Sequence, residues 1–459
     1  MAHFKSRFVL FVILIPELAL AQNVPASPPP AAPPGASQQP SPPGSTAVSS
    51  AFTAKLYGFV EADGIWDSTR SFNDLAGNAA IIRPGTLAGD HSRLQTSIRN
   101  SRFGLKFSGP HSADVKTSGM LETDFMGNQP PNVSEGAFFN SPGLRVRHAM
   151  IKLETPYLDV LAGQYWELFG WQSYFHPNSV EIQGVPGQVY SRTMQLRLSH
   201  VFKTAPLNVE VAVAGARPLN RDVALPDAQG GLRFVLNGWK GLHTAGSTGT
   251  AIDAAAIGVS GVARQFKVAE FSATPASEKT KSGAALSLDA LLPIIPASEG
   301  SKANALTLTA SFVNGTGIAD QYTGLTGGIG FPALPNPTGT SPAPTYSPNI
   351  DNGLVTYGKD GRLHAINWQS YLLGAQYYLP PTGNVWLSAN VSHMKSTNID
   401  SWGDPGKVFV ESLWADANAF WDIDGAMRVG AEYAYFHQKY ADGETAKDSR
   451  VQLSAFYIF

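Results

Sequence analysis

The sequence predicts an all-β fold, a transmembrane antiparallel β-barrel of about sixteen strands that spans residues 54–459. Segments in which apolar and polar residues alternate recur throughout that range, and a period of two is the period of a β-strand. The connections between these segments are alternately long and short. No apolar run in the range approaches the roughly 18 residues of a spanning helix, so a chain that crosses a membrane there must close into a barrel.

The first 53 residues are not expected to belong to the barrel. Basic residues precede an apolar run at 8–15, and small residues follow it up to Ala21. This pattern predicts a signal peptide, residues 1–21, that directs export and is cleaved after Ala21. Residues 22–53 are rich in Pro, Ala, Ser and Gly, so we expect a disordered periplasmic tether. The tether is either a solvated spacer or a contact to peptidoglycan or to a periplasmic partner.

Sixteen segments carry the alternation, and each is predicted to form one strand. They lie near 54–67, 93–108, 113–126, 143–154, 158–167, 191–203, 206–216, 229–238, 252–265, 282–291, 303–313, 365–378, 384–395, 408–420, 426–439 and 448–459. The odd-numbered connectors are long, and most even-numbered connectors are short turns. Outer-membrane barrels keep their short turns in the periplasm and their long loops outside, whereas a soluble sandwich has no reason to sort its connectors.

The two faces of each predicted strand differ in the sense that a membrane barrel requires. Leu121 and Leu453 fall on apolar faces, whereas Glu122 and Arg450 fall on the opposite ones. We therefore expect apolar side chains to face lipid and polar ones to face a lumen. Aromatic residues near strand ends suit two interfacial girdles, although some of them can face the lumen instead: Tyr57, Trp66, Trp239, Tyr377, Tyr378, Trp386, Trp414 and Trp421.

Charged residues on the strands are the candidates for pore lining and selectivity. A charge that faces lipid costs roughly 2–4 kcal/mol at the midplane, so we expect these residues inside. The basic candidates are Arg99, Arg102, Arg145, Arg147 and Arg197, and the acidic ones are Glu61, Asp63, Glu122 and Asp124. Guanidinium groups bind carboxylates bidentately, which favours anions. The alternative is that these charges pair across the wall and stiffen the barrel.

Two details of this set stay open at the level of sequence. Arg197 has the clearest inward register, because Gln195 and Ser199 share its face. The register of strand 143–154 is unsettled, because Arg147 and His148 are adjacent and both polar. Alternation would place these two side chains on opposite faces.

The loop at 168–190 is predicted to constrict the lumen. It is rich in aromatic residues that can pack against an inner wall. Its candidate polar groups are Tyr174, His176, Asn178, Glu181 and Gln183, with Arg192 just after the loop, unless that side chain lies at the rim. The alternative is an ordinary surface loop. Whether the other long loop, at 314–364, plugs the lumen is also open.

Other functional classes have little support in the sequence. The chain has no Cys and a formal net charge of −2, which argues against Cys-ligated metal sites and against nucleic-acid binding. It contains no G-x-S-x-G, P-loop, H-E-x-x-H or G-x-G-x-x-G motif. We therefore expect no catalytic residues, no metal and no cofactor, and not an enzyme.

Several short stretches resemble the DcaP-like trimeric outer-membrane porins. They are the residues LYGFVEAD at 56–63, SRFG at 101–104, GQYW at 163–166, PGQVYSR at 186–192, and the segment from Arg217-Pro218 to Leu225-Pro226-Asp227. The resemblance implies a sixteen-stranded barrel, a homotrimer and uptake of small anionic solutes such as dicarboxylates. One departure is the Pro-rich segment 22–50, where family members often carry a helical, coiled-coil-like segment.

The sequence thus predicts a porin of the bacterial outer membrane. Small hydrophilic solutes, mainly anionic and dicarboxylate-like, would diffuse through a water-filled lumen narrowed by loop 168–190. Its expected partners are these solutes, outer-membrane lipid and lipopolysaccharide, two further copies of the chain, and peptidoglycan through the tether. The alternatives are a structural barrel that anchors the membrane to the cell wall, and an outer-membrane enzyme.

Overall fold

The computed structural model describes most of the barrel range. The described residues are 52–76, 80–110, 114–127, 143–181, 184–219, 222–245, 249–272, 275–297, 301–322, 349–358, 360–402 and 408–459. They belong to one compact unit, Ser50–Phe459. The predicted signal peptide and nearly all of the predicted tether lie outside the described residues.

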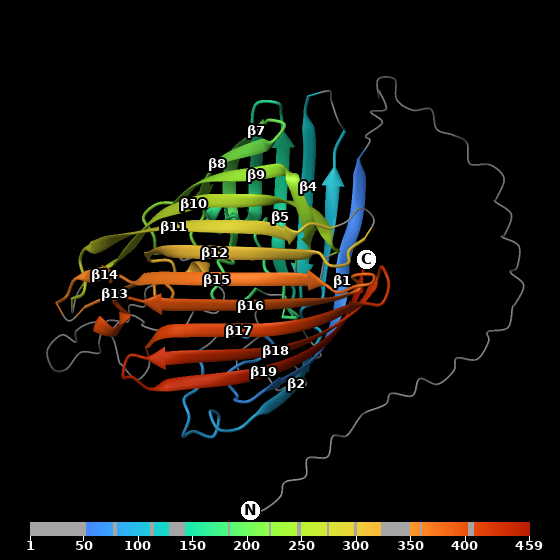
Figure 1. Cartoon of the computed structure of the whole chain (residues 1–459). Helices are drawn as coiled ribbons and strands as arrows, with labels where there is room; N and C mark the ends of the chain where they lie inside the picture. Colours follow the sequence, from blue (N-terminus) through green and yellow to red (C-terminus); the bar gives the residue numbers. More distant parts are fainter. Residues whose placement is uncertain are drawn as a thin grey trace, which may run out of the picture. The chain divides into compact units, whose positions relative to one another are not determined.

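The predicted sixteen-stranded antiparallel barrel is confirmed (Figure 1). Its strands are β1 (Thr53–Asp67), β2 (Arg93–Ser97), β3 (Arg102–Ser108), β4 (Lys116–Asp124), β5 (Arg145–Glu154), β6 (Asp159–Trp166), β7 (Arg192–Lys203), β8 (Leu207–Ala216), β9 (Asp227–His243), β10 (Ala251–Ala269), β11 (Glu278–Ile295), β12 (Leu306–Thr316), β15 (Asn367–Tyr378), β16 (Val385–Ser396), β17 (Phe409–Asp422), β18 (Met427–Tyr440) and β19 (Thr445–Ile458). Strand β1 pairs with β19 and closes the sheet.

Strands β2 and β3 together occupy the position of the second strand of the barrel. Both pair with β1, on either side of a short break in the ladder. The hydroxyl of Ser101 takes the place of a strand partner at this break. It accepts a hydrogen bond from the backbone N–H of Glu61 over 2.9 Å, and it donates one to the Glu61 carbonyl over 3.2 Å. The predicted single strand 93–108 is therefore one barrel strand that is interrupted between Ser97 and Arg102.

A register shift in the β4–β5 pairing settles the orientation of strand 143–154. Glu122 lies opposite His148, and the next residue, Thr123, lies opposite Val146. The extra residue on β5 is Arg147, and such a bulge re-aims a side chain. Arg147 and His148 are consequently both buried inside the barrel. Strict alternation does not hold at this position.

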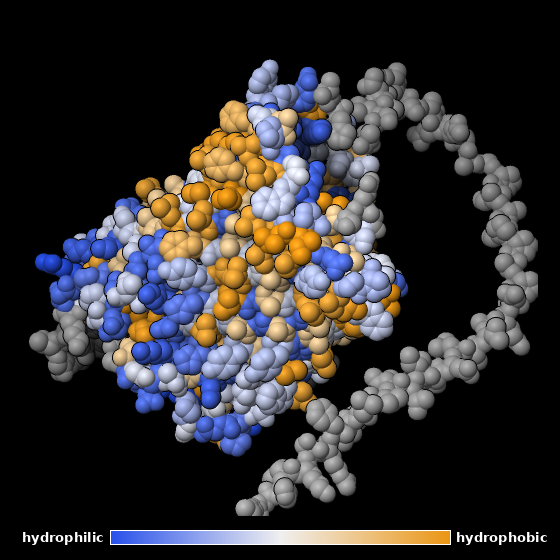
Figure 2. Space-filling model, viewed as in Figure 1, coloured by the Kyte–Doolittle hydropathy of each residue, from blue (hydrophilic) through white to orange (hydrophobic). Residues whose placement is uncertain are grey.

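The two faces of the wall have the predicted polarity. Leu121 and Leu453 are 42% and 59% exposed on the outside, whereas Glu122 and Arg450 are buried inside. Figure 2 shows apolar residues gathered over the middle of the strands around β7–β12. In the described part of the chain no helix is long and apolar enough to cross a membrane.

The aromatic residues divide between the two faces. Trp66, Trp239 and Trp421 are exposed on the outside, as expected for an interfacial girdle. The side chains of Tyr378, Trp386 and Trp414 are buried inside instead. Trp386 stacks on Phe420 with 4.0 Å between ring centroids. Tyr57 also faces inward, and its hydroxyl donates to Glu122 over 2.9 Å. These positions follow the alternative that some of the aromatic residues face the lumen.

Loops pack inside the barrel at the long-loop end. Segment 349–358, with the small hairpin β13 (Val355–Tyr357) and β14 (Leu363–Ala365), joins an apolar cluster that includes Phe72, Ile318 and Trp368. The indole of Trp368 donates to the carbonyl of Gly353 over 2.9 Å. The described part of the predicted loop 314–364 therefore occupies the mouth of the barrel, and residues 323–348 lie outside the described residues.

Some connectors are shorter than predicted. Connector 266–281 is reduced to 270–277 because β10 and β11 continue their ladder beyond the predicted ends. Connector 440–447 is reduced to 441–444, a turn in which Gly443 takes a φ of 91°, and glycine adopts that conformation without steric cost. The strand ends that the longest connectors join still lie at one end of the barrel, opposite the short turns and Phe459 (Figure 1).

Candidate functional site

The loop between β6 and β7 folds into the lumen and is anchored first on β9 and β10. The short 3-10 turn η1 (Phe169–Trp171) starts it. The backbone N–H of Gly170 donates to the Ser260 hydroxyl over 2.8 Å, and the Trp171 indole donates to the Val259 carbonyl over 3.1 Å. The Trp171 ring packs against Gly258, where an added Cβ would lie 2.7 Å from it. A side chain at this wall position would displace the loop.

The loop then reaches strands on another part of the wall. The backbone N–H of Val180 donates to Asn418 on β17 over 2.8 Å. The N–H of Glu181 donates to Glu432 on β18 over 3.0 Å. The carbonyl of Asn178 accepts hydrogen bonds from side chains on β16. Because it contacts β9–β10 and β16–β18, the loop crosses the interior of the barrel.

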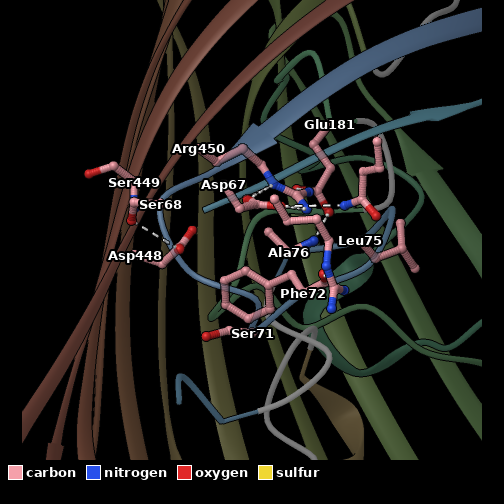
Figure 3. Close-up of polar contacts among 12 residues, drawn as sticks. Asp67, Ser68, Ser71, Phe72, Leu75, Ala76, Glu181, Asp448, Ser449 and Arg450 are labelled. Carbon is pink, nitrogen blue, oxygen red and sulfur yellow. Dashed lines mark hydrogen bonds and ion pairs between the residues drawn. The ribbon is translucent and has the colours of Figure 1, made fainter. Parts of the chain in front are cut away.

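Arg450 joins this loop to the barrel wall and to the first long loop (Figure 3). Its guanidinium donates to both carboxylate oxygens of Asp67, over 2.8 and 3.1 Å, and to Glu181 over 3.2 Å. It also donates to the carbonyls of Asn73 and Asp74. A fully buried cation with this many partners fixes the position of the loop tip.

A cavity of about 480 Å³ lies between this loop and the wall formed by β1 and β3–β6. Lys55, Ala245, Gly249 and Phe459 line it at the short-turn end of the barrel. Its lining also includes Lys106 near that end. Deeper in the lumen it includes Tyr57, Arg102, Glu122, Arg147, His148, Tyr165, Trp166, His176, Asn178, Glu181 and Tyr190. The cavity is therefore both charged and aromatic.

Two arginines in this lining differ in how fully they are paired. Arg147 donates to Glu122 over 2.7 Å, to Asp124 over 3.1 Å and to the Tyr190 hydroxyl over 3.3 Å. The Nε of Arg102 lies 3.7 Å from Glu122, beyond hydrogen-bonding distance. Within the described residues, its Nε and Nη2 have no hydrogen-bond partner. Arg102 therefore carries two buried donors that no group of the described chain satisfies.

Aromatic rings form one wall of the cavity. The ring of Trp166 lies 4.7 Å from the rings of both His176 and Tyr190. The guanidinium of Arg192 lies over Trp166 and Tyr190, 4.8 and 5.2 Å from their centroids. Such contacts hold a cation without a carboxylate, and they place Arg192 against these rings rather than at the rim.

The loop groups have shifted proton affinities. Burial, reinforced by the electrostatic effects of His243 and Arg147, lowers the pKa of His176 to about 3, so this imidazole is neutral. Burial raises the pKa of Glu181 to about 8, and Glu432 adds to this effect, although Arg450 opposes it. For Tyr190, burial would raise the pKa, but nearby arginines outweigh it and lower the pKa to about 8.

Six of the predicted site residues line the cavity, and the others lie elsewhere. The six are Arg102, Arg147, Glu122, His176, Asn178 and Glu181. Tyr174 lies under Arg233, whose guanidinium carbon is 3.5 Å from its ring centroid. Gln183 lies outside the described residues.

The remaining predicted charges are paired or buried in the wall. Arg145 forms a bidentate pair with Asp124, at 3.0 and 2.6 Å. Arg99 donates to Asp74 over 3.0 Å, and Arg197 donates to Gln195 and to the Trp166 carbonyl. Glu61 and Asp63 are buried on the inner face of β1.

Sequence reasoning missed several lining residues, chiefly Lys55, Lys106, His148, Tyr165 and Trp166. Lys55 and Lys106 carry a usable signal, because each lies between lipid-facing residues of its strand and the two are register partners. The bulge hides His148, and nothing local assigns Trp166 to the lumen rather than to a girdle.

A closed barrel with an apolar exterior, an inward-folded loop and a charged cavity defines the architecture of an outer-membrane channel. No family model matches the chain, and no curated protein matches its sequence. The structure is similar to the outer membrane channel DcaP of Acinetobacter baumannii, with a TM-score of 0.63 and 17% identity over 89% of this chain and 97% of that one. The chain thus has the fold of the DcaP-like channels, as the sequence resemblance implied.

Two other solved structures show weaker similarity. One is OmpF of Salmonella typhi in complex with daunomycin, with a TM-score of 0.49 and 12% identity over 88% of this chain and 97% of that one. The other is an anion-selective porin from Comamonas acidovorans, with a TM-score of 0.48 and 12% identity over 89% of this chain and all of that one.

Proposed function

We propose that the protein is a porin of the bacterial outer membrane through which small hydrophilic anions, dicarboxylates among them, diffuse passively. The observation that carries this proposal is the cavity beside the inward-folded loop 168–190. Its lining includes four basic side chains, Lys55, Lys106, Arg102 and Arg147, and two acidic ones, Glu122 and Glu181. A lumen with this excess of positive charge concentrates anions and depletes cations.

The positive side chains also lie at successive depths. Lys55 and Lys106 are register partners near the short-turn end, and Arg102 lies deeper on the same strand as Lys106. An anion can pass from one to the next, and conduction requires sites that bind without retaining the solute. A solute with two carboxylates can engage the free donors of Arg102 with one of them, as guanidinium groups bind carboxylates bidentately.

The setting of the channel belongs to the same proposal. The chain is exported with cleavage after Ala21, the barrel assembles as a homotrimer, and its apolar exterior contacts lipid and lipopolysaccharide. The tether reaches toward peptidoglycan. Chemical cross-linking of the purified protein should give a ladder that ends at three copies, and N-terminal sequencing of the mature chain should begin at Gln22.

Planar bilayers test the channel itself. Purified protein should give stepwise conductance, and a KCl gradient should give a reversal potential of the sign that chloride permeation produces. Succinate added to one side should carry current and transiently reduce the chloride conductance. An electrically silent barrel would refute the channel, and cation preference would show that the acidic residues dominate the lumen.

A further inference from the structure

Basic side chains gather on the outside of the barrel at the long-loop ends of β16, β18 and β19. Lys395, Lys439 and Lys447 are exposed there, and His393 and His437 are partly exposed two residues closer to the middle of their strands. We call these five residues the basic rim. The strand faces that carry them otherwise hold apolar residues such as Val391.

Strand pairing places these residues side by side. Lys395 lies opposite Glu411, and Glu411 lies opposite Lys439 on the next strand. One row further in, His437 lies opposite Lys447. Directly opposite residues have Cβ atoms about 4.5–5.5 Å apart, so the basic rim is one continuous patch. Figure 2 shows hydrophilic residues over this end of β15–β19.

The patch keeps most of its positive charge. In the part of the chain that the structure describes, the side chains of the three lysines have no salt bridge or hydrogen bond. The carboxylate of Glu411 is held by the imidazole of His393, 2.7 Å away. Positive charge on the outer face of a barrel is costly in hydrocarbon but favourable beside anionic headgroups. The basic rim therefore suits an anion at headgroup level.

An apolar groove lies on the outer wall beside the basic rim. It has a volume of about 380 Å³ and is lined by Leu288, Ala290, Ala310, Phe312, Tyr371 and Leu373, together with His393. The rings of Phe312 and Tyr371 lie 5.1 Å apart along it. Because His393 belongs to both the groove and the basic rim, an apolar chain in the groove would end beside the cationic patch.

We propose that the basic rim and this groove bind one phosphorylated, acylated lipid of the outer leaflet, the chemistry of the lipid A part of lipopolysaccharide. The lysines contact the phosphates, and one acyl chain lies in the groove. The proposal rests on the outer-membrane setting given under Proposed function and on the orientation expected from the connectors, with the long loops outside. Free phosphate would use the lysines alone, because it has no chain to place in the groove.

Binding of purified lipid A to the purified barrel in detergent tests this site, by native mass spectrometry or by fluorescence titration. The bisphosphorylated form should bind more tightly than the monophosphorylated form. Each lysine beside an anionic lipid surface contributes about a fivefold effect, so the triple variant Lys395→Gln, Lys439→Gln, Lys447→Gln should bind about 100-fold more weakly. Inorganic phosphate in excess should displace little of the bound lipid.

Two further variants separate the parts of the site. Ala310→Phe fills the groove without changing any charge and should weaken lipid A binding. Lys267→Gln, which removes an exposed lysine at the same rim on β10 that pairs with Glu278, should leave binding unchanged and is the matched control for Lys439→Gln. The triple lysine variant, Ala310→Phe and Lys267→Gln should all conduct ions as the unsubstituted protein does, since the substituted residues lie outside the lumen.

The outcomes distinguish this proposal from the channel proposal. Equal binding of lipid A by the triple variant and the unsubstituted barrel would overturn the lipid site while leaving the channel intact. The lipid site would also be overturned if Lys267→Gln weakened lipid A binding as much as Lys439→Gln does. It would likewise be overturned if the triple variant lost its oligomeric state but still bound lipid A. A barrel that binds lipid A through these lysines but is electrically silent would refute the channel alone.

Discussion

Replacing Arg102 with glutamine should weaken the preference of the channel for anions. The guanidinium lines the cavity, its side chain is 12% exposed, and its nearest carboxylate oxygen lies 3.7 Å away without a hydrogen bond. Glutamine keeps a similar length and removes the charge. The matched variant Arg102→Lys keeps the charge and loses the planar fork, so it separates charge from geometry.

The size of the effect follows from Coulomb's law. A unit charge 4 Å from a passing anion contributes about 1 kcal/mol in bulk water and more in a confined lumen. An energy of about 1 kcal/mol is roughly a fivefold factor in an equilibrium constant. The ratio of chloride to potassium permeability should therefore fall at least about fivefold in the Arg102→Gln channel.

The assay is the zero-current potential of single channels in a tenfold KCl gradient. Arg102→Lys and Lys267→Gln should both retain the potential of the unsubstituted channel, since one keeps the charge and the other removes a charge outside the lumen. An unchanged potential in Arg102→Gln would refute the reasoning, because it would place the ion path away from this cavity. Equally lowered potentials in Arg102→Gln and Lys267→Gln, with Arg102→Lys unchanged, would point to net charge rather than position.

Three further predictions concern the loop inside the barrel. Trp171→Ala removes a fully buried ring and about 3–5 kcal/mol of the packing that holds the loop against the wall. The loop should then narrow the lumen less, and single-channel conductance should rise. Trp421→Ala, at a lipid-facing position, should leave the conductance unchanged. Because the pKa of Glu181 is about 8, raising the pH from 7 to 9 adds negative charge and should reduce anion preference. Glu181→Gln should make that pH dependence smaller, and an equal dependence would exclude this group. Arg450→Met leaves the buried carboxylate of Asp67 without its partner. The free energy of unfolding, measured in urea, should therefore fall by about 3–5 kcal/mol. An unchanged free energy of unfolding would contradict the role of the pair.

The strands could be predicted because lipid imposes a period of two on every one of them. The ends of β9, β10 and β11 could not, since these strands continue past the predicted limits into regions where no hydrocarbon selects apolar residues. Lys267 near the end of β10 is exposed and paired with Glu278. On β10 the polarity of the alternation reverses there, with Phe266 and Val268 buried inside, although the hydrogen-bonded ladder continues.

The site was less accessible than the fold because it depends on contacts between distant segments. The inward fold of loop 168–190 was expected from its aromatic residues, but the wall positions that the loop packs against were not. Trp171 needs the bare backbone of Gly231 and Gly258, and nothing in the loop points to those positions. The bulge at Arg147 likewise arises from the pairing of β4 with β5 rather than from the residues of β5 alone.

The pairing of β1 with β19 has a consequence for how the barrel forms. The N–H groups of Gly58 and Phe459 each donate to the carbonyl of the other, over 2.9 and 3.0 Å. Strands from opposite ends of the barrel sequence must meet, which carries a large loop-closure entropy and slows folding. A half-finished sheet would expose two unpaired edges to hydrocarbon. Insertion must therefore be nearly all-or-none, with the chain kept unfolded until its final strand is available.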